Sequence, residues 1–428
     1  MTELWASPTR NTALSTRVRI PGSKSLTNRW LILAAIANGP SRISHPLLAR
    51  DTKLMASALS ALGIAVELDG DAFIVTPGIL QGSTNIDCGL AGTVMRFVPP
   101  VAALANGDVR FDGDPAARVR PMQKIVDSLR ALNVEVEDDG RGTLPFTVHG
   151  TGHVEGGVIT IDASASSQFV SALLLAGARY DKGILVEHKG GTLPSMPHID
   201  MTLEVLAHVG VQVEKNIVDA NNATWTVHPG NVQAFNITVE PDLSNAAPFV
   251  AAALVCGGSV TIPDWPMQTT QAGDALRELL PAMGATVTRT GHDLTVTGTG
   301  LEGLKGIDVD LHDVGELTPV IAALCALAQT PSHLKGIAHL RGHETDRLAA
   351  LEREINQLGG NVTQTDDGLI IQPAPLHGGV FHTYEDHRMA MAGAVLGLAV
   401  DGLQIENIAT TGKTLPDFDV MWQTLVNS

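Results

Sequence analysis

Cysteine is scarce in this chain, and long apolar runs are absent. The 428 residues include three cysteines, Cys88, Cys256 and Cys325, whose odd number and wide spacing fit neither a disulfide framework nor a zinc site. We therefore expect buried free thiols, no metal and a reducing compartment, the cytoplasm. The segment Met1–Arg10 lacks the apolar stretch of a signal peptide, and the longest apolar runs are too short to span a bilayer, so we expect no membrane association.

Positive charge is also in short supply, because the formal net charge is −17. This balance excludes nucleic-acid binding through a general basic surface. An acidic protein that binds anions must instead concentrate its cations at one place. Aromatic residues make up only 4% of the chain and hydrophobic residues 44%, which predicts an aliphatic, alanine-rich core. Because 428 residues exceed one ordinary core, we expect two domains.

The chain contains an internal repeat. A helix with apolar residues at positions i, i+4 and i+7 ends at Gly or Asn, and two residues separate that end from the Val of a following strand. The five ending residues are Gly63, Asn133, Gly210, Gly284 and Gly359. Asp-Gly pairs at 69–70, 139–140 and 367–368 predict turns between paired strands. We therefore expect each copy to be a helix followed by a strand, and often by a hairpin.

A second, alanine-rich helix type alternates with the first. We predict its six copies at Arg29–Asn38, Met95–Ala105, Phe169–Ala178, Phe249–Cys256, Pro319–Ala328 and Arg388–Ala399. The period of roughly seventy residues is longer than the periods of solenoid repeats. Six units divide into three and three, so we expect one domain of residues 1–20 plus 240–428 and an inserted domain of residues 21–239. The sixth unit is cut short, and we expect a strand around Val18–Ile20 to complete it.

Most of the alanine-rich helices open with Ser, Thr, Asp or Gly, which cap helix N-termini, as in Asp242-Leu243-Ser244-Asn245. A helix N-terminus presents free N–H groups and the positive end of a dipole, so it favours anions. If the repeats pack symmetrically, several such ends point at one cleft between the domains. Cations gather in the same segments: Lys24, Arg29, Arg96, Arg120, Arg347, Arg388 and Lys413. They are either surface ion-pair partners or the walls of a pocket for phosphates and carboxylates.

Seven segments give the chain a resemblance to a known family. They are Pro21–Arg29, Leu90–Arg96, Arg120-Pro121, Ser166–Phe169, Glu344–Arg347, Asp386–Ala390 and Lys413–Asp417. In this order they resemble the 5-enolpyruvylshikimate-3-phosphate (EPSP) synthase family. The resemblance implies an α/β (α+β) fold, an inside-out α/β barrel of two domains with three βαβαββ units each, and substrates bound in the cleft. It also implies a monomer without metal or organic cofactor.

The resemblance assigns roles residue by residue. It implies transfer of the enolpyruvyl group from phosphoenolpyruvate to the 5-hydroxyl of shikimate 3-phosphate, in the pathway to aromatic amino acids, which glyphosate inhibits. The implied shikimate 3-phosphate ligands are Lys24, Ser25, Arg29, Ser166, Ser167, Gln168, Ser195, Glu316 and His343. The implied phosphoenolpyruvate ligands are Lys24, Gly92, Arg120, Gln168, Arg347, Arg388 and Lys413. Gly92 is expected to matter for space, because a missing side chain lets a ligand approach the backbone.

The reaction removes one proton and delivers another, so it needs an acid and a base. We assign Glu316 as the base, with Asp313 as the alternative, and Glu344 as the acid. Lys24 is expected to share a proton step.

The chain also departs from the family pattern at several positions. His343 stands where the family often has Lys, His339 where it has Asn, and His198 where it has Tyr. Leu90 replaces a common Asn, and Phe97 follows Arg96 where Pro is frequent, which we expect to shift Gly92.

Two other functions compete with this prediction. The sister enolpyruvyl transferase acts on UDP-N-acetylglucosamine, and many of its members have a reactive Cys before the Arg-Pro pair. The corresponding loop here, Asp112–Arg118, has none. A non-catalytic anion-binding protein on the same scaffold would keep the cations and lose the carboxylates, and the presence of Glu316 and Glu344 argues against it.

Overall fold

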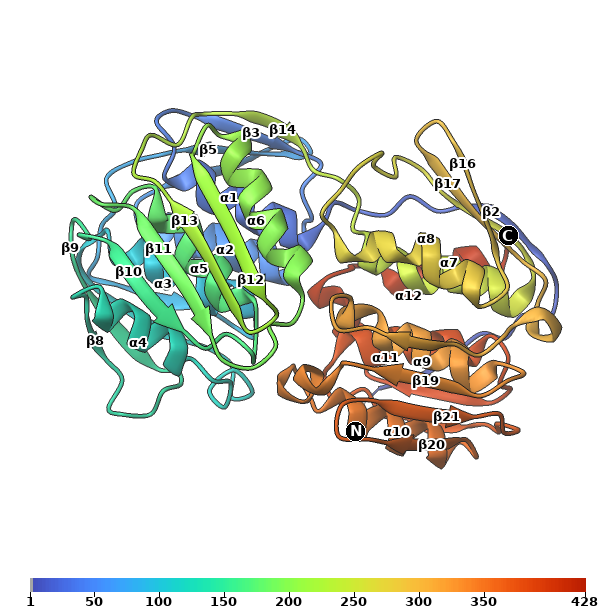
Figure 1. Ribbon diagram of the computed structural model, residues 1–428. Helices are drawn as coiled ribbons and strands as arrows, with labels where there is room; N and C mark the ends of the chain where they lie inside the picture. The colour runs from blue at the N-terminus through green and yellow to red at the C-terminus, as the bar shows by residue number, and fades with distance from the viewer. Residues whose placement is uncertain (1–2) are drawn as a thin grey trace. The chain divides into compact units, whose positions relative to one another are not determined.

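The computed structural model describes residues 3–428, which divide into two compact units (Figure 1). Unit 1 contains the N-terminal segment up to Pro21 together with Glu240–Ser428, and unit 2 is Gly22–Val239. Both chain ends therefore belong to unit 1. The sequence predicted crossings near residues 20 and 240.

Unit 2 contains six helices and twelve strands. In chain order they are α1 (Lys24–Ala35), β3 (Ser41–Ser44), α2 (Arg50–Ala61), β4 (Ala65–Asp69), β5 (Ala72–Thr76), β6 (Thr84–Asp87), α3 (Gly92–Ala102), β7 (Asn106–Asp112), α4 (Gln123–Ala131), β8 (Glu135–Glu137), β9 (Phe146–Thr151), β10 (Gly157–Ile161), α5 (Gln168–Gly177), β11 (Ile184–Lys189), α6 (Met196–His208), β12 (Val213–Asp219), β13 (Asn222–Val227) and β14 (Asn236–Thr238).

Unit 1 repeats the same alternation. Its α-helices and strands are β1 (Leu4–Ala6), β2 (Leu14–Arg17), α7 (Leu243–Cys256), β15 (Gly258–Ile262), α8 (Leu276–Ala282), β16 (Thr286–Thr290), β17 (Asp293–Gly298), β18 (Asp308–Asp310), α9 (Thr318–Leu327), β19 (Ser332–Lys335), α10 (Arg347–Gln357), β20 (Asn361–Gln364), β21 (Leu369–Gln372), β22 (Gly379–Phe381), α11 (His387–Gly397), β23 (Leu403–Glu406) and α12 (Phe418–Val426). Its short 3₁₀ helices are η1 (Ala272–Ala275), η2 (Leu301–Gly303), η3 (Gly315–Leu317), η4 (Ala338–Gly342) and η5 (Ile408–Lys413).

The strands form six open sheets, five of which share one pattern, and none of those described for residues 3–428 closes on itself. In the sheet β6-β7-β9-β8, the first two strands are parallel and the others antiparallel. The sheets β10-β11-β13-β12, β14-β3-β5-β4, β2-β15-β17-β16 and β18-β19-β21-β20 repeat it. The sixth has three strands, β1-β23-β22. The βαβαββ unit is thus present, with the first strand of two units supplied from elsewhere in the chain.

The prediction for the N-terminal strand was wrong in its partner. The sixth sheet is completed by β1, which pairs antiparallel with β23. The segment before Val18 is instead β2, which pairs parallel with β15, and the Val18 amide donates to the Thr261 carbonyl. Gly258 explains the choice of partner, because a Cβ there would meet the Leu14 carbonyl oxygen at 2.1 Å. Only glycine lets the two backbones approach so closely.

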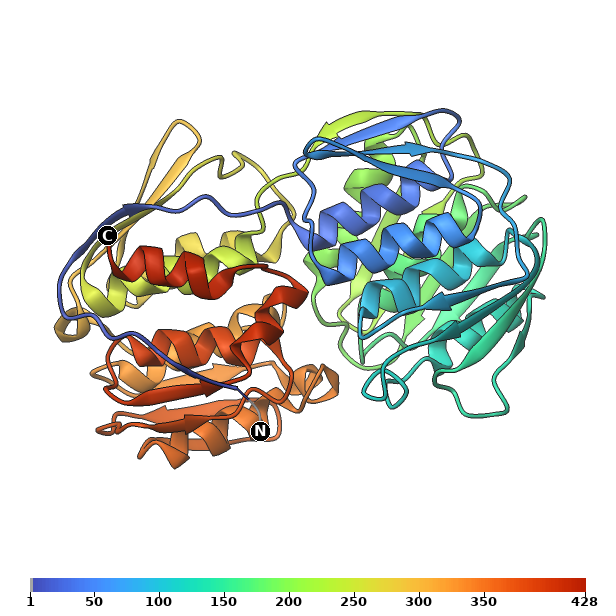
Figure 2. The same ribbon diagram turned by 180° about the vertical axis from the view of Figure 1, so that it is seen from behind.

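The six alanine-rich helices are α1, α3, α5, α7, α9 and α11, and they form the interior of the two units. Nearly every residue in them is buried. Figure 1 shows the β10–β13 sheet over α5, and Figure 2 shows α1 and α3 from behind. Their abundant alanines allow close helix packing, so the predicted aliphatic core is confirmed. No helix in the described part of the chain is both long and apolar enough to cross a membrane.

The helices of the other type end where the repeat predicted. Gly63, Asn133, Gly210, Gly284 and Gly359 have φ angles of 89°, 61°, 79°, 105° and 91°. This left-handed conformation stops a helix and turns the chain into the next strand. The five predicted helix ends are therefore confirmed.

Candidate active site

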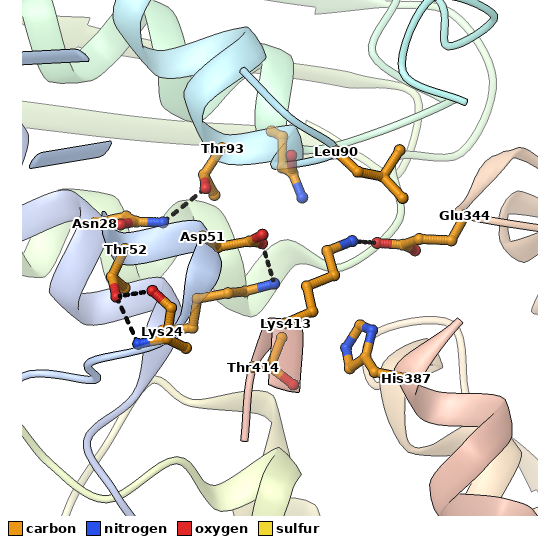
Figure 3. A network of polar contacts seen from close by, with 12 residues as sticks. Lys24, Asn28, Asp51, Thr52, Leu90, Thr93, Glu344, His387, Lys413 and Thr414 are labelled. Carbon is orange, nitrogen blue, oxygen red and sulfur yellow. Dashed lines mark hydrogen bonds and ion pairs between the residues drawn. The ribbon is translucent and has the colours of Figure 1, made fainter. Parts of the chain in front are cut away.

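In unit 2, the first interior helix begins with a lysine that is paired with a buried carboxylate. The Ser23 hydroxyl caps α1 by accepting from the Leu26 amide. Lys24 follows, and its Nζ lies 3.6 Å from Oδ2 of Asp51 at the start of α2 (Figure 3). The neighbouring Asn28 amide donates to the Thr93 hydroxyl at 2.7 Å, which ties α1 to α3. Asp51 fixes the ammonium that the sequence predicted as a catalytic and binding group.

Arg29 lies deeper than the sequence predicted. It is 1% exposed, and its guanidinium donates to the Thr202 hydroxyl and to the carbonyls of Ser25 and His198. The ring of Phe97 lies 5.2 Å from its central carbon. These contacts support a positioning role for Arg29, and the predicted effect of Phe97 on Gly92 stays a prediction. Direct contact of Arg29 with a phosphate stays a prediction.

Arg120 lies at the N-terminus of α3. A Cβ on Gly92, the first residue of α3, would lie 3.2 Å from each terminal guanidinium nitrogen of Arg120. Arg120 is 7% exposed, and its Nη1 donates weakly to the Leu90 carbonyl at 3.4 Å. Among residues 3–428 its Nε has no hydrogen-bond partner and it makes no ion pair. A buried cation without a carboxylate, beside a helix N-terminus, is typical of an anion site.

The start of α5 holds the remaining predicted ligands of unit 2. Arg96 donates to the Gln168 side chain at 2.7 Å, so it fixes the amide that the sequence assigned to both substrates. The Ser166 hydroxyl accepts from the backbone N–H of Gln168 at 3.3 Å. Ser167 is the cap residue of α5, directly before Gln168. Ser195 caps α6 in the left-handed conformation, with φ 55°, and the carbonyl of His198, three residues further, accepts from Arg29. Arg29 therefore links α1 to the Ser195 segment.

Unit 1 arranges its cations differently. Arg347 donates from Nε to Asp386 at 2.8 Å and from Nη2 to Glu344 at 3.3 Å. Burial by itself lowers the pKa of Arg347, but the charges of Asp386 and Glu344 outweigh it, so the pKa is raised. Glu344 also pairs with the Lys413 ammonium (Figure 3). One carboxylate thus joins two predicted phosphoenolpyruvate ligands.

Glu316, the predicted base, accepts a hydrogen bond from the Ser244 hydroxyl. The Ser244 carbonyl in turn accepts from Nη1 of Arg388 at 2.8 Å. Arg388 is 6% exposed and makes no ion pair with any residue in the described chain. The alternative base, Asp313, is exposed. The geometry therefore favours Glu316, because it shares a partner with a predicted ligand.

Histidines replace common family residues near the same carboxylates. The Nδ1 atom of His343 lies 3.9 Å from Glu344. His339 packs against η3, since a Cβ on Gly315 would meet its Nε2 at 2.6 Å. His343 thus lies beside the carboxylate of unit 1, and its role as a ligand stays a prediction. His339 supports the segment that presents Glu316.

Sequence reasoning missed four residues of these networks: Ser244, Asn245, Asp51 and Thr414. Three are uncharged and lie in segments that were noted for other residues or as helix openings. Asp51 lies in the first turn of α2, and the sequence did not connect it with Lys24. The Asp242-Leu243-Ser244-Asn245 opening was recognised only as a helix cap, which Asp242 confirms by accepting from the Asn245 amide at 2.9 Å.

The cysteines are free thiols outside both networks. Cys88 and Cys325 are buried, and Cys256 is partly buried. Burial raises the pKa of all three, that of Cys256 to about 11, so thiolate chemistry is disfavoured at neutral pH. No group of three or more potential metal ligands occurs within residues 3–428.

Comparison with known proteins identifies the family. The model of the EPSP synthase (3-phosphoshikimate 1-carboxyvinyltransferase) family matches residues 8–422. This chain belongs to that family. A curated 3-phosphoshikimate 1-carboxyvinyltransferase of Kocuria rhizophila is 56% identical over 438 aligned positions, which cover 100% of this chain and 97% of the relative. The family membership predicted from the seven motifs is therefore confirmed.

Solved structures show the same fold at lower identity. The EPSP synthase of Acinetobacter baumannii superposes with a TM-score of 0.79 at 24% identity, covering 98% of this chain and 97% of that one. The enolpyruvyl transferase NikO of Streptomyces tendae gives a TM-score of 0.75 at 18% identity, covering 97% and 96%. The predicted enolpyruvyl transferase fold is thus confirmed, with sheets that are individually open.

Proposed function

We propose that this chain is a 3-phosphoshikimate 1-carboxyvinyltransferase. It transfers the enolpyruvyl group of phosphoenolpyruvate to the 5-hydroxyl of shikimate 3-phosphate and releases phosphate, in the shikimate pathway to aromatic amino acids. Family membership over nearly the whole chain supports this reaction. The observation that supports it most is the network of unit 1, in which Glu316 and Glu344 lie among Arg347, Arg388 and Lys413.

The roles follow from the contacts. Arg120 and Arg388 are buried cations without carboxylate partners among the described residues, so they suit the charges of phosphoenolpyruvate. Lys24, Ser25, Ser166, Ser167, Gln168, Ser195 and His343 bind shikimate 3-phosphate, and Gly92, Arg347 and Lys413 bind phosphoenolpyruvate. Each of the two sets contains residues of both units, since His343 belongs to unit 1 and Gly92 to unit 2.

Proton transfer uses the two carboxylates of unit 1. Glu316 takes the proton of the attacking 5-hydroxyl, while C3 of phosphoenolpyruvate gains one through the Glu344–Lys413 pair, with Lys24 assisting. A tetrahedral intermediate forms, phosphate leaves, and C3 returns its proton. The cations stabilise charge on the carboxylate and on the departing phosphate, and they hold two anions together for reaction.

Phosphate release tests the proposal. The purified chain is mixed with phosphoenolpyruvate and either shikimate 3-phosphate or UDP-N-acetylglucosamine. We expect phosphate release when shikimate 3-phosphate is the acceptor and none when UDP-N-acetylglucosamine is. Release with the nucleotide sugar alone would identify the sister activity instead, and binding without release would identify a non-catalytic anion-binding protein.

The proposal also includes a cytoplasmic monomer that binds no nucleic acid or membrane and needs no cofactor. Sedimentation equilibrium of the purified chain tests the monomer, because a dimer would give twice the mass of one chain. Turnover after exhaustive chelation tests the independence from metal.

A further inference from the structure

The first turn of α7 is rigidly held in unit 1. Asp242 caps it by accepting from the Asn245 amide, and the Leu243 amide donates to the Gln271 side chain at 3.2 Å. Ser244 is 5% exposed and Asn245 is 0% exposed. Both side chains therefore have fixed neighbours rather than solvent around them.

Ser244 contacts two predicted site residues from two different repeats. Its hydroxyl donates to Oε1 of Glu316 on η3, and its carbonyl accepts from Arg388 on α11 at 2.8 Å. A carboxylate with one oxygen held by a hydroxyl keeps its other oxygen in a defined direction. Ser244 thus fixes the orientation of the proposed base relative to a proposed phosphoenolpyruvate ligand.

Asn245 contacts a third segment of the site. The side-chain Nδ2 of Asn245 donates to the Thr414 carbonyl at 3.0 Å, and the Thr414 hydroxyl donates to Oδ1 of Asn245 at 3.4 Å. Thr414 directly follows Lys413, whose ammonium pairs with Glu344. Asn245 therefore fixes the backbone that presents Lys413.

We infer that Ser244 and Asn245 are positioning residues for the proposed transfer, Ser244 for the base Glu316 and Asn245 for the cation Lys413. This inference rests on the proposed function. Neither residue is expected to touch a substrate, and each acts through the group that it holds. Because the two residues hold different groups, their loss should change different kinetic quantities.

Ser244→Ala removes the hydroxyl that stabilises the ionised Glu316. We expect kcat to fall about 10-fold, with KM values nearly unchanged, because a hydrogen bond to a charged group is lost. The low-pH limb of the kcat/KM profile should move to higher pH by roughly one pH unit, since the carboxylate then holds its proton to higher pH. The charged groups near Glu316 include Arg347 and Arg388, which keep their charge over this range. Glu344, which accepts a hydrogen bond from Arg347, and His339 are titratable and are the same in every variant.

Three further variants control for mere packing effects. Ser244→Cys has nearly the same size but only a weak donor, so it should reproduce the shifted limb. Ser244→Thr retains the hydroxyl and should restore the wild-type limb. Ser128→Ala removes another buried hydroxyl, which donates to the Lys124 carbonyl outside the networks, and should leave both kcat and the limb unchanged.

Asn245→Ala should instead raise the KM for phosphoenolpyruvate about 10-fold and leave the pH limb in place, because it releases the Lys413 segment. Equal losses in both variants, with unchanged limbs and lowered melting temperatures, would show a merely structural role and overturn the inference. If the wild-type chain releases no phosphate at all, the proposed function fails and the inference with it. If the wild type is active and the low-pH limb of Ser244→Ala is not shifted, the inference is overturned and the proposed function stands.

Discussion

The predicted cations of the two units have different hydrogen-bond and ion-pair partners. In unit 2, Arg29 is surrounded by hydroxyl and carbonyl oxygens, and Arg96 donates to a neutral amide. Arg120 has a carbonyl at 3.4 Å and no ion pair among the described residues. In unit 1, Arg347 and Lys413 are paired with Asp386 and Glu344. In unit 2, Lys24 pairs with Asp51, whereas Arg120 keeps its charge without an ion pair to any described residue.

This difference separates binding from proton transfer. Neutral oxygens satisfy the donors of a guanidinium but leave its charge to attract an anion, so unit 2 is suited to hold phosphate groups. Carboxylates beside cations lower the net charge of unit 1 while they supply groups that exchange protons. We therefore expect Arg120 of unit 2 and Arg388 of unit 1 to attract a ligand with several negative charges, and the carboxylates of unit 1 to exchange its protons.

The largest expected effect breaks the chemistry assigned to unit 1. Glu316→Gln keeps the size and the acceptor for Ser244 but removes the base, so kcat should fall on the order of 10³-fold with little change in KM. Steady-state phosphate release measures it. The comparison variant is Asp313→Asn, the exposed alternative, which should retain near-normal turnover. Normal turnover in Glu316→Gln together with a large loss in Asp313→Asn would reverse the assignment of the base.

The next effect tests the charge of Arg120, which makes no ion pair with a described residue. Arg120→Ala should lower kcat/KM for phosphoenolpyruvate on the order of 10²-fold, because a desolvated charge that contacts the ligand is removed. Arg118→Ala is the matched control. Arg118 is an exposed neighbour already paired with Asp112, and its loss should change kcat/KM less than twofold. Equal losses of kcat/KM in the two variants would mean that only the overall positive potential of this loop matters, and that Arg120 makes no specific contact with the ligand.

A smaller effect sharpens the role of space beside Arg120. The backbone of Gly92 lies outside the left-handed region, so Gly92→Ala adds only a methyl group, at 3.2 Å from the Arg120 guanidinium. Displacement of that guanidinium should raise the KM for phosphoenolpyruvate about 10-fold and leave the KM for shikimate 3-phosphate unchanged. Gly230→Ala, where a Cβ meets nothing within 4 Å, should change neither KM. A change in the shikimate 3-phosphate KM alone would contradict the assigned ligand.

The repeat explains which parts of the fold the sequence could predict. Helix ends at Gly63 and Asn133 depend on local backbone conformation, so they were readable from five similar segments. The partner of the N-terminal strand depends on pairing with residues more than two hundred positions away, and no local pattern encodes it. Gly258 was the one local sign, since its missing side chain permits the approach of Leu14.

The site shows the same limit. Charged residues at helix openings, such as Arg120 and Arg388, stood out against an acidic chain. The depth of Arg29 did not, because its burial results from Thr202 and His198 on α6 folding over it. Ser244 and Asn245 were seen only as a helix start, since a hydroxyl or an amide is informative only when its partner is known. Sequence therefore identified the charges, and the structure adds the neutral groups that hold them.

The smallest expected effect concerns Asp138, a charged residue that is expected to stabilise the fold without taking part in the reaction. Although burial by itself raises the pKa of Asp138, donation by Arg130 and by the Gly142 and Gly140 amides lowers it below its ordinary value. Asp138→Asn should therefore cost about 1–2 kcal/mol of unfolding free energy at neutral pH and leave kcat and KM unchanged. Urea denaturation at several pH values measures the loss.

The pH dependence and a neighbouring aspartate decide whether the lowered pKa of Asp138 is the cause. A carboxyl group whose pKa is lower in the folded state than in the unfolded chain stabilises the fold above the unfolded value, about 3.9, and loses that stabilisation as pH falls through the folded value. The gap between wild type and Asp138→Asn should therefore close in acid. Asp139→Asn alters an exposed ion pair with Arg141 and should change stability by less than about 0.5 kcal/mol. A gap that persists at pH 2 would show that Asp138 acts through packing rather than through its charge.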